Sequence, residues 1–204
     1  MAVYLDNSAT TKPCKEATAA IINALEENYG NPSSLHNIGI EAKKAVIKAR
    51  RNIADVMACE EEEIFFTSGG TEANNLAVFG AVYANRRKGN RIVTTAIEHE
   101  SVMQSIDRLE EEGFEVIRLI PDEYGNVHFK DLAEAINEKT ILVSMMYINN
   151  EVGSILPVDK IKKLVLKAGA PALIHTDCVQ AFGKTEVKPK KLGADLVSVS
   201  GHKI

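Results

Sequence analysis

Short apolar runs alternate with helix-like stretches from residue 64 onward, and this alternation restricts the fold more than any other feature of the sequence. The runs are rich in Val, Ile, Thr and Phe, as β-strands are, and they read EIFFT, RIVTTAI, FEVIRLI, TILVSMMYI, ALIHTD and DLVSVS. Several are almost continuously apolar, which is typical of strands covered by helices on both faces. The pattern predicts an α/β fold with three layers and a mostly parallel sheet.

The segments between these runs have the apolar spacing of amphipathic helices. Helices are expected over residues 15–28, 39–57, 71–87, 100–112, 130–138 and 157–168. A chain of 204 residues has room for one main domain. After the last apolar run the sequence ends in a polar turn with no closing helix, so we expect this domain to be truncated at its C-terminal end.

Composition excludes several classes of function. The formal charge is −4 and no long basic run is present, so nucleic acid is not an expected partner. No stretch approaches the roughly 20 apolar residues of a membrane span, and the N-terminus does not resemble a secretory signal. Cys14, Cys59 and Cys178 are too widely spaced for a disulfide framework or a metal site. These features predict a cytoplasmic protein with reduced thiols and no metal.

A glycine-rich turn, Thr67–Asn75, stands between an apolar run and a predicted helix. Such a turn presents backbone N–H groups and the positive end of the helix dipole to an anion. Gly69 and Gly70 permit close approach of a phosphate, and the Thr71 hydroxyl either bonds the ligand or caps the helix. A simple helix cap explains the motif equally well. It is neither a Walker motif nor a dinucleotide-binding fingerprint.

Two further motifs follow apolar runs. Asp177 ends the run ALIHTD, where ligands of open α/β sheets bind, and it is placed to pair with a cationic ring nitrogen, with Gln180 three residues on. Lys203 follows DLVSVS, and a lysine near a desolvated pocket acts as an amine nucleophile. Taken singly, Asp177 as a helix cap and Lys203 as a surface charge are the simpler interpretations.

His99 and the pair Asn149-Asn150 also follow apolar runs. An imidazole at His99 is suited to stack on a flat cofactor or to transfer protons, and the two amides are suited to bond a ring hydroxyl. Capping and turn formation are the alternatives. A phosphate turn, a carboxylate for a ring nitrogen and a lysine at the strand ends of one sheet together predict a site for pyridoxal 5'-phosphate (PLP).

The order of the motifs resembles that of the NifS/IscS-type cysteine desulfurases, which belong to the fold type I (aspartate aminotransferase-like) PLP enzymes. The resemblance runs from residue 4 to the end of the chain through YLDNSATT, GNPSSLH, FTSGGTEANN, EHESV, NNEVG, DCVQ and SGHK. It implies that residues 15–204 are the PLP-binding large domain, incomplete at its C-terminal end. Residues 1–14 would belong to the family's small-domain or interface part.

The resemblance also implies a role for each site residue. Lys203 would carry PLP and Asp177 would pair with the pyridine nitrogen. His99 would stack on the ring and take part in proton transfer. The other expected contacts are to the 3-hydroxyl region, from Asn150 and Gln180, and to the phosphate, from Gly70, Thr71, Ser200 and His202.

The implied reaction converts L-cysteine to L-alanine and passes sulfur to an enzyme cysteine as a persulfide. Iron–sulfur cluster or thio-cofactor synthesis would use this sulfur, with acceptor or scaffold proteins as partners and a homodimer as the assembly. The family's nucleophilic cysteine and substrate-binding arginine are expected after residue 204, so this chain alone is expected to be inactive. Cys178 stands where relatives usually have a small residue such as Ala, and Ala181 where many have Ser. A selenocysteine lyase, a related PLP lyase and a catalytically inactive fragment are the alternatives.

Overall fold

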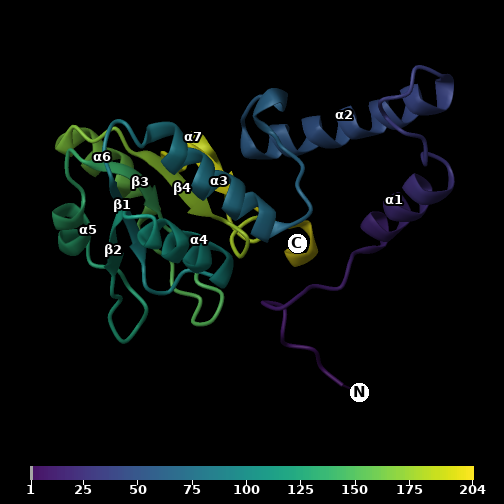
Figure 1. Cartoon of the computed structure of the whole chain (residues 1–204). Helices are drawn as coiled ribbons and strands as arrows, with labels where there is room; N and C mark the ends of the chain where they lie inside the picture. Colours follow the sequence, from purple (N-terminus) through teal and green to yellow (C-terminus); the bar gives the residue numbers. More distant parts are fainter. Residues whose placement is uncertain (1) are drawn as a thin grey trace. The chain divides into compact units, whose positions relative to one another are not determined.

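The computed structural model describes residues 2–204, which form two compact units (Figure 1). One unit ends at Phe66 and the other spans Thr67–Ile204. The sequence predicted a boundary after residue 14 instead, and whether residues 15–66 belong with the sheet as one large domain stays a prediction. No helix of the described residues is both long enough and apolar enough to cross a membrane.

The N-terminal unit is helical and buries little. It contains α1 (Lys15–Glu26), α2 (Asn37–Met57) and the 3₁₀ turn η1 (Glu61–Glu63). Both long helices were predicted. α1 has no buried residue, although it carries Ile21, Ile22 and Leu25.

One predicted strand is wrong. EIFFT forms no strand in the described chain. Its Ile64 carbonyl accepts instead from a guanidinium N–H of Arg50, and the same guanidinium lies 4.9 Å from the centre of the Phe66 ring. The side chains of Phe65 and Phe66 are exposed rather than buried. An apolar run alone did not distinguish a sheet strand from an extended connector.

The second unit is the α/β part. Its five strands form one parallel sheet in the order β2-β1-β3-β4-β5. The strands are β1 (Arg91–Thr95), β2 (Glu115–Leu119), β3 (Thr140–Ser144), β4 (Leu173–Asp177) and β5 (Leu196–Ser198). The helices are α3 (Gly70–Asn85), α4 (Glu100–Glu111), α5 (Phe129–Ala135), α6 (Val158–Ala168) and α7 (Pro189–Leu192), followed by the 3₁₀ turn η2 (Gly201–Lys203). The predicted α/β class is confirmed.

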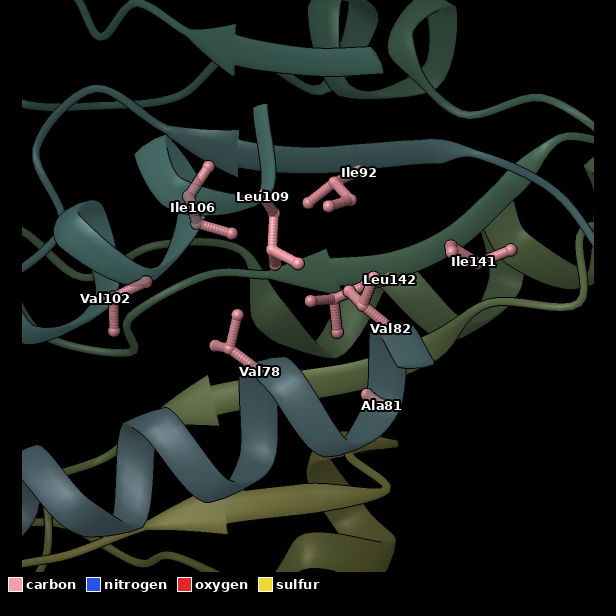
Figure 2. Close-up of a cluster of buried hydrophobic side chains, with 9 residues drawn as sticks. All are labelled: Val78, Ala81, Val82, Ile92, Val102, Ile106, Leu109, Ile141 and Leu142. Carbon is pink, nitrogen blue, oxygen red and sulfur yellow. The ribbon is translucent and has the colours of Figure 1, made fainter. Parts of the chain in front are cut away.

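The central strands β1, β3 and β4 are buried on both faces, whereas the outer strands β2 and β5 are mostly half-buried. On one face Ile92 and Leu142 are in register and pack beneath α3 and α4, as Figure 2 shows. Their neighbours Val93, Val143 and Ile174 point to the other face and have no exposed surface. Fully buried parallel strands explain why the apolar runs lack polar alternation.

The order of the strands positions the candidate site. The chain goes from β1 to β2 on one side, and then β3 pairs with the opposite side of β1. Ligands of open α/β sheets bind at such a reversal, beyond the carboxyl ends of the strands. His99 follows β1, Asn150 follows β3, Asp177 ends β4 and Ser200 follows β5. All four therefore lie at the same end of the sheet, beyond the carboxyl ends of its strands.

Candidate cofactor site

A pocket of about 180 Å³ lies at the carboxyl ends of the strands, entirely within the second unit. Gly69 and Asn149, which the sequence also suggested as cofactor contacts, are not part of its wall. Nine other predicted site residues line it: Gly70, Thr71, His99, Asn150, Asp177, Gln180, Ser200, His202 and Lys203. These residues are spread over more than 130 positions of the sequence, and the parallel sheet brings them together. Their individual roles stay predictions.

The glycine-rich turn opens α3. The helix is capped by Gly69, which offers no side-chain bond, so Thr71 is not the cap and its side chain lines the pocket instead. The Glu72 carboxylate bends back to accept from the Ser68 N–H at 2.6 Å, and this bond lowers the pKa of Glu72. A β-carbon added at Gly70 would lie 3.4 Å from a Val179 methyl and 3.8 Å from the Ser200 β-carbon. A side chain at this position would therefore fill the space between the turn and Ser200, whereas glycine leaves the backbone of the turn open to a ligand's phosphate.

Asp177 is oriented by two donors. Its Oδ1 accepts from the Val179 backbone N–H at 2.9 Å, and its Oδ2 accepts from the Asn74 side-chain amide at 2.8 Å. Only 5% of the residue is exposed. Each carboxylate oxygen has two lone pairs, so the group retains the capacity to accept from a ligand N–H.

His99 caps α4 with its own side chain. Its Nδ1 accepts from the Ser101 backbone N–H at 3.2 Å and lies 2.8 Å from the Ser101 hydroxyl. The sequence left capping and cofactor contact as alternatives. The structure combines capping through Nδ1 with a place in the pocket wall.

The two adjacent asparagines differ in what they contact. Asn149 performs the turn chemistry, since its Oδ1 accepts from the backbone N–H groups of Glu151 and Val152 at 2.9 Å. Its Nδ2 also donates to the Ile97 carbonyl at 3.0 Å, which ties the turn to the segment before His99. Asn150 lines the pocket.

Lys203 ends the short turn η2, where its backbone N–H donates to the Ser200 carbonyl at 3.3 Å. The lysine is half-buried, and His202 precedes it in the same wall. The side-chain oxygen of Gln180, which also lines the pocket, accepts from Lys184 at 3.2 Å.

Sequence reasoning missed some residues of the pocket wall. Asn74 and Ser101 belong to motifs that were noticed, but no role was assigned to them; Met146, Ile148 and Val179 complete the set. Asn74 follows Gly70 by one helical turn, and this spacing was a usable signal. Its partner Asp177 lies 103 residues away, and no local pattern reveals that contact.

The cysteines lie outside this wall. Cys178 is fully buried beside Asp177, and burial raises the pKa of its thiol. Its burial directly after β4 fits a position where relatives usually have a small residue such as Ala. Cys14 accepts from the Ala17 backbone N–H as the cap of α1, and Cys59 is half-buried; both belong to the other unit.

Two buried ionisable groups lie next to the site. Glu98 precedes His99; its Oε1 accepts from the Thr95 hydroxyl at 2.6 Å and from the Met146 N–H at 2.9 Å. Burial raises the pKa of Glu98 to about 8. His175, in β4, bridges the hydroxyls of Ser144 at 2.8 Å and Ser198 at 3.0 Å, and burial lowers its pKa to about 4.

Comparison with known proteins places this site in context. The family model "Aminotransferase class-V" matches residues 3–204. A cysteine desulfurase IscS of Methanosarcina thermophila is 47% identical over 98% of this chain and 49% of its own length. The chain thus spans about half the length of the curated relatives it matches.

Solved structures agree. A NifS-like protein superposes with a TM-score of 0.95 and 39% identity, covering 100% of this chain and 56% of that protein. An apo cysteine desulfurase of Thermococcus onnurineus gives 0.90 and 30%, covering 98% and 50%. The predicted fold and the predicted resemblance are confirmed. With the sheet, the pocket and the sequence match in agreement, the chain belongs to the aminotransferase class-V family.

Proposed function

We propose that the pocket of the second unit binds PLP and that Lys203 carries it covalently. One observation supports this above the others: residues from five separated motifs line a single pocket at the carboxyl edge of the parallel sheet. The chemistry of these groups fits the cofactor. The turn at Gly70 is suited to its phosphate, the Asp177 carboxylate to its ring nitrogen and the Lys203 amine to its aldehyde.

PLP, when bound, supplies an electron sink for carbanion chemistry. In this proposal Asp177 holds a proton on the ring nitrogen, which makes the ring more electron-withdrawing. Asn150 and Gln180 bond the 3-hydroxyl region, while Thr71, Ser200 and His202 join Gly70 around the phosphate. His99 lies against the ring and moves protons, and Lys203 provides the amine.

We further propose that the whole protein is a cysteine desulfurase that converts L-cysteine to L-alanine and leaves sulfur on an enzyme cysteine. The names of its relatives support this activity. No cysteine of the described residues lines the pocket, so the proposal assigns the sulfur-accepting cysteine to a part of the protein outside this chain. A homodimer in the cytoplasm that delivers sulfur to acceptor or iron–sulfur scaffold proteins completes the proposal.

The test uses the full-length protein with PLP and L-cysteine. Alanine should be released, and Lys203→Ala should abolish both its release and the visible absorption of the lysine-bound cofactor. Lys130→Ala is the matched control, because the Lys130 side chain is 83% exposed and its ammonium lies 3.9 Å from the Glu134 carboxylate. Normal alanine release by Lys203→Ala would refute the assignment.

A second assay distinguishes the alternatives. L-Selenocysteine as the preferred substrate would identify a selenocysteine lyase. The 204-residue chain alone should form no persulfide even if it binds PLP. Alanine production by this chain alone would contradict the assignment of the cysteine to another part of the protein.

A further inference from the structure

Asn74 is the most deeply buried polar side chain on α3, with 1% of its surface exposed. Its Nδ2 donates one hydrogen to Asp177 Oδ2 at 2.8 Å and the other to the Ser101 hydroxyl at 2.9 Å. The Ser101 hydroxyl in turn lies 2.8 Å from His99 Nδ1. A chain of hydrogen bonds therefore runs from the carboxylate of Asp177, through Asn74 and Ser101, to the imidazole of His99.

The donors and acceptors of this series of hydrogen bonds have only one consistent arrangement. A carboxylate only accepts, so the Asn74 group facing Asp177 is the NH₂ and not the oxygen. Since the second NH₂ hydrogen occupies the Ser101 oxygen, the Ser101 proton is available to His99. The Ser101 backbone N–H also points at His99 Nδ1, and an N–H can never accept. Nδ1 must therefore carry a lone pair, and a neutral His99 has its proton on Nε2.

We propose that Asn74 is a positioning residue that fixes the Asp177 carboxylate and, by donating to the Ser101 oxygen, directs the Ser101 hydroxyl proton toward His99 Nδ1. The Ser101 backbone N–H already keeps this nitrogen unprotonated. This inference rests on the proposed PLP site, where Asp177 and His99 act on the same ring. One amide then sets the orientation of the acceptor for the ring nitrogen and the second hydrogen bond to the stacking imidazole together. Loss of Asn74 therefore alters both Asp177 and His99, although the Asn74 side chain contacts only Asp177 of the two.

The burial of this amide explains why the arrangement persists. Its neighbours, Asp177 and Ser101, are themselves buried, so water does not compete for the bonds. A hydrogen bond to a charged acceptor in such a place is stronger than one at the surface. The Asn74 oxygen is buried and has no hydrogen-bond partner within residues 2–204, so the side chain is retained through its two donated bonds.

Two measurements on the full-length protein test the proposal. The first is the equilibrium dissociation constant for PLP. Asn74→Ala should weaken binding roughly 10-fold to 100-fold, because the Asp177 carboxylate loses its fixed orientation. The second is the ¹⁵N resonance of His99 Nδ1 in the PLP-free protein. In the wild type it should be that of an unprotonated nitrogen with two donors, and in Asn74→Ala it should move toward that of a nitrogen bonded by the Ser101 backbone N–H alone.

The matched control is Asn85→Ala. Asn85 is a buried amide on the same helix, donates within residues 2–204 only to the Ala81 carbonyl at 2.9 Å, and does not line the pocket. Its replacement removes a buried amide from α3 without touching Asp177 or Ser101, so any general loosening of α3 should appear there as well. We expect PLP affinity within about twofold of wild type and an unchanged His99 resonance.

Ser101→Ala separates the effect on Asp177 from the effect on His99, and it provides a test if Asn74→Ala does not fold. It keeps the bond from Asn74 to Asp177, so PLP affinity should fall less than in Asn74→Ala, while the His99 Nδ1 resonance should still move. Wild-type values of both quantities in Asn74→Ala, or an unchanged resonance in Ser101→Ala, would overturn the inference. If the wild-type protein itself binds no PLP, the proposed function fails first, and the two failures are thereby distinguished.

Discussion

The two ends of helix α3 differ in what they contribute. Near its start, Asn74 makes directional hydrogen bonds to charged and polar partners. One turn later the same side of the helix carries Val78, Ala81 and Val82, which pack on Ile92 and its neighbours without any polar contact (Figure 2). The apolar end fixes where the helix lies, and that fixed position lets the polar end hold a carboxylate within hydrogen-bonding distance.

The strands beneath the helix show the same division. Ile92 and Leu142 form an apolar row, and two residues further along these strands, on the same face, are Thr94 and Ser144. Burying a polar group costs free energy unless the group is hydrogen-bonded. His175, in the neighbouring strand β4, is buried and meets this condition through its hydrogen bonds with the hydroxyls of Ser144 and Ser198. Packing and ligand chemistry should therefore be separable by substitution, as the following predictions state from the largest effect to the smallest.

Leu109→Ala removes a side chain with no exposed surface from the apolar cluster. We expect the free energy of unfolding to fall by about 2–5 kcal/mol in urea titrations. PLP affinity of the folded protein should stay within about twofold of wild type. Leu166→Ala, at a side chain that is 71% exposed, is the control and should change stability by less than about 0.5 kcal/mol. A large loss of PLP affinity in Leu109→Ala would show that the two regions are not separable.

Glu98→Gln should change how stability depends on pH. The folded-state pKa is raised to about 8 from an ordinary 4.5, so between these values the folded protein holds a proton that the unfolded chain releases. The free energy of unfolding should therefore decrease as pH rises through this window, by up to about 1.4 kcal/mol per pH unit. Glutamine cannot ionise and should remove this slope. Glu134→Gln, an exposed side chain, should retain it.

His175→Gln tests the opposite sign. Burial lowers the folded-state pKa of His175 to about 4 from 6.5, so the unfolded chain binds a proton first as pH falls. This group contributes stability that is complete above pH 6.5 and is lost as pH falls through 4. The variant should be less stable at neutral pH, because it disrupts two buried bonds, but its acid denaturation should be less steep. His128→Gln, at an exposed histidine, should leave the wild-type slope unchanged.

Gly70→Ala should have the smallest effect on stability. The added methyl meets no atom closer than 3.4 Å, so we expect a change within about 1 kcal/mol. PLP affinity should nevertheless decrease, because the methyl lies between the turn and Ser200. Gly80→Ala, later in the same helix and with nothing within 4 Å, should preserve affinity. Equal affinity of both variants would remove Gly70 from the phosphate site.

Local pattern predicted much of the fold. Continuous apolar runs identified all five strands of the sheet, and helix ends were predicted to within a few residues, as for α2 and α6. Prediction from local pattern failed for one apolar run, whose contacts lie outside the run itself. The run EIFFT is a connector whose Ile64 carbonyl accepts from Arg50, and nothing within the run signals that partner.

The candidate site shows the same limit. Residues in recognisable motifs, such as Lys203 and Asp177, were predicted and line the pocket. The links between them were not, because Asn74 reaches Ser101 and Asp177 only after the sheet has brought three distant segments together. Sequence indicates which groups are present, whereas their hydrogen-bond order depends on the fold.

The central claim, that Lys203 carries PLP in this pocket, has one most direct test. The full-length protein is incubated with PLP, treated with borohydride to fix any carbon–nitrogen bond, digested, and its peptides are weighed by mass spectrometry. We predict that the added mass of reduced PLP lies on Lys203 and is absent from the Lys203→Ala variant. Label on another lysine, or on none in the wild type, would contradict the account.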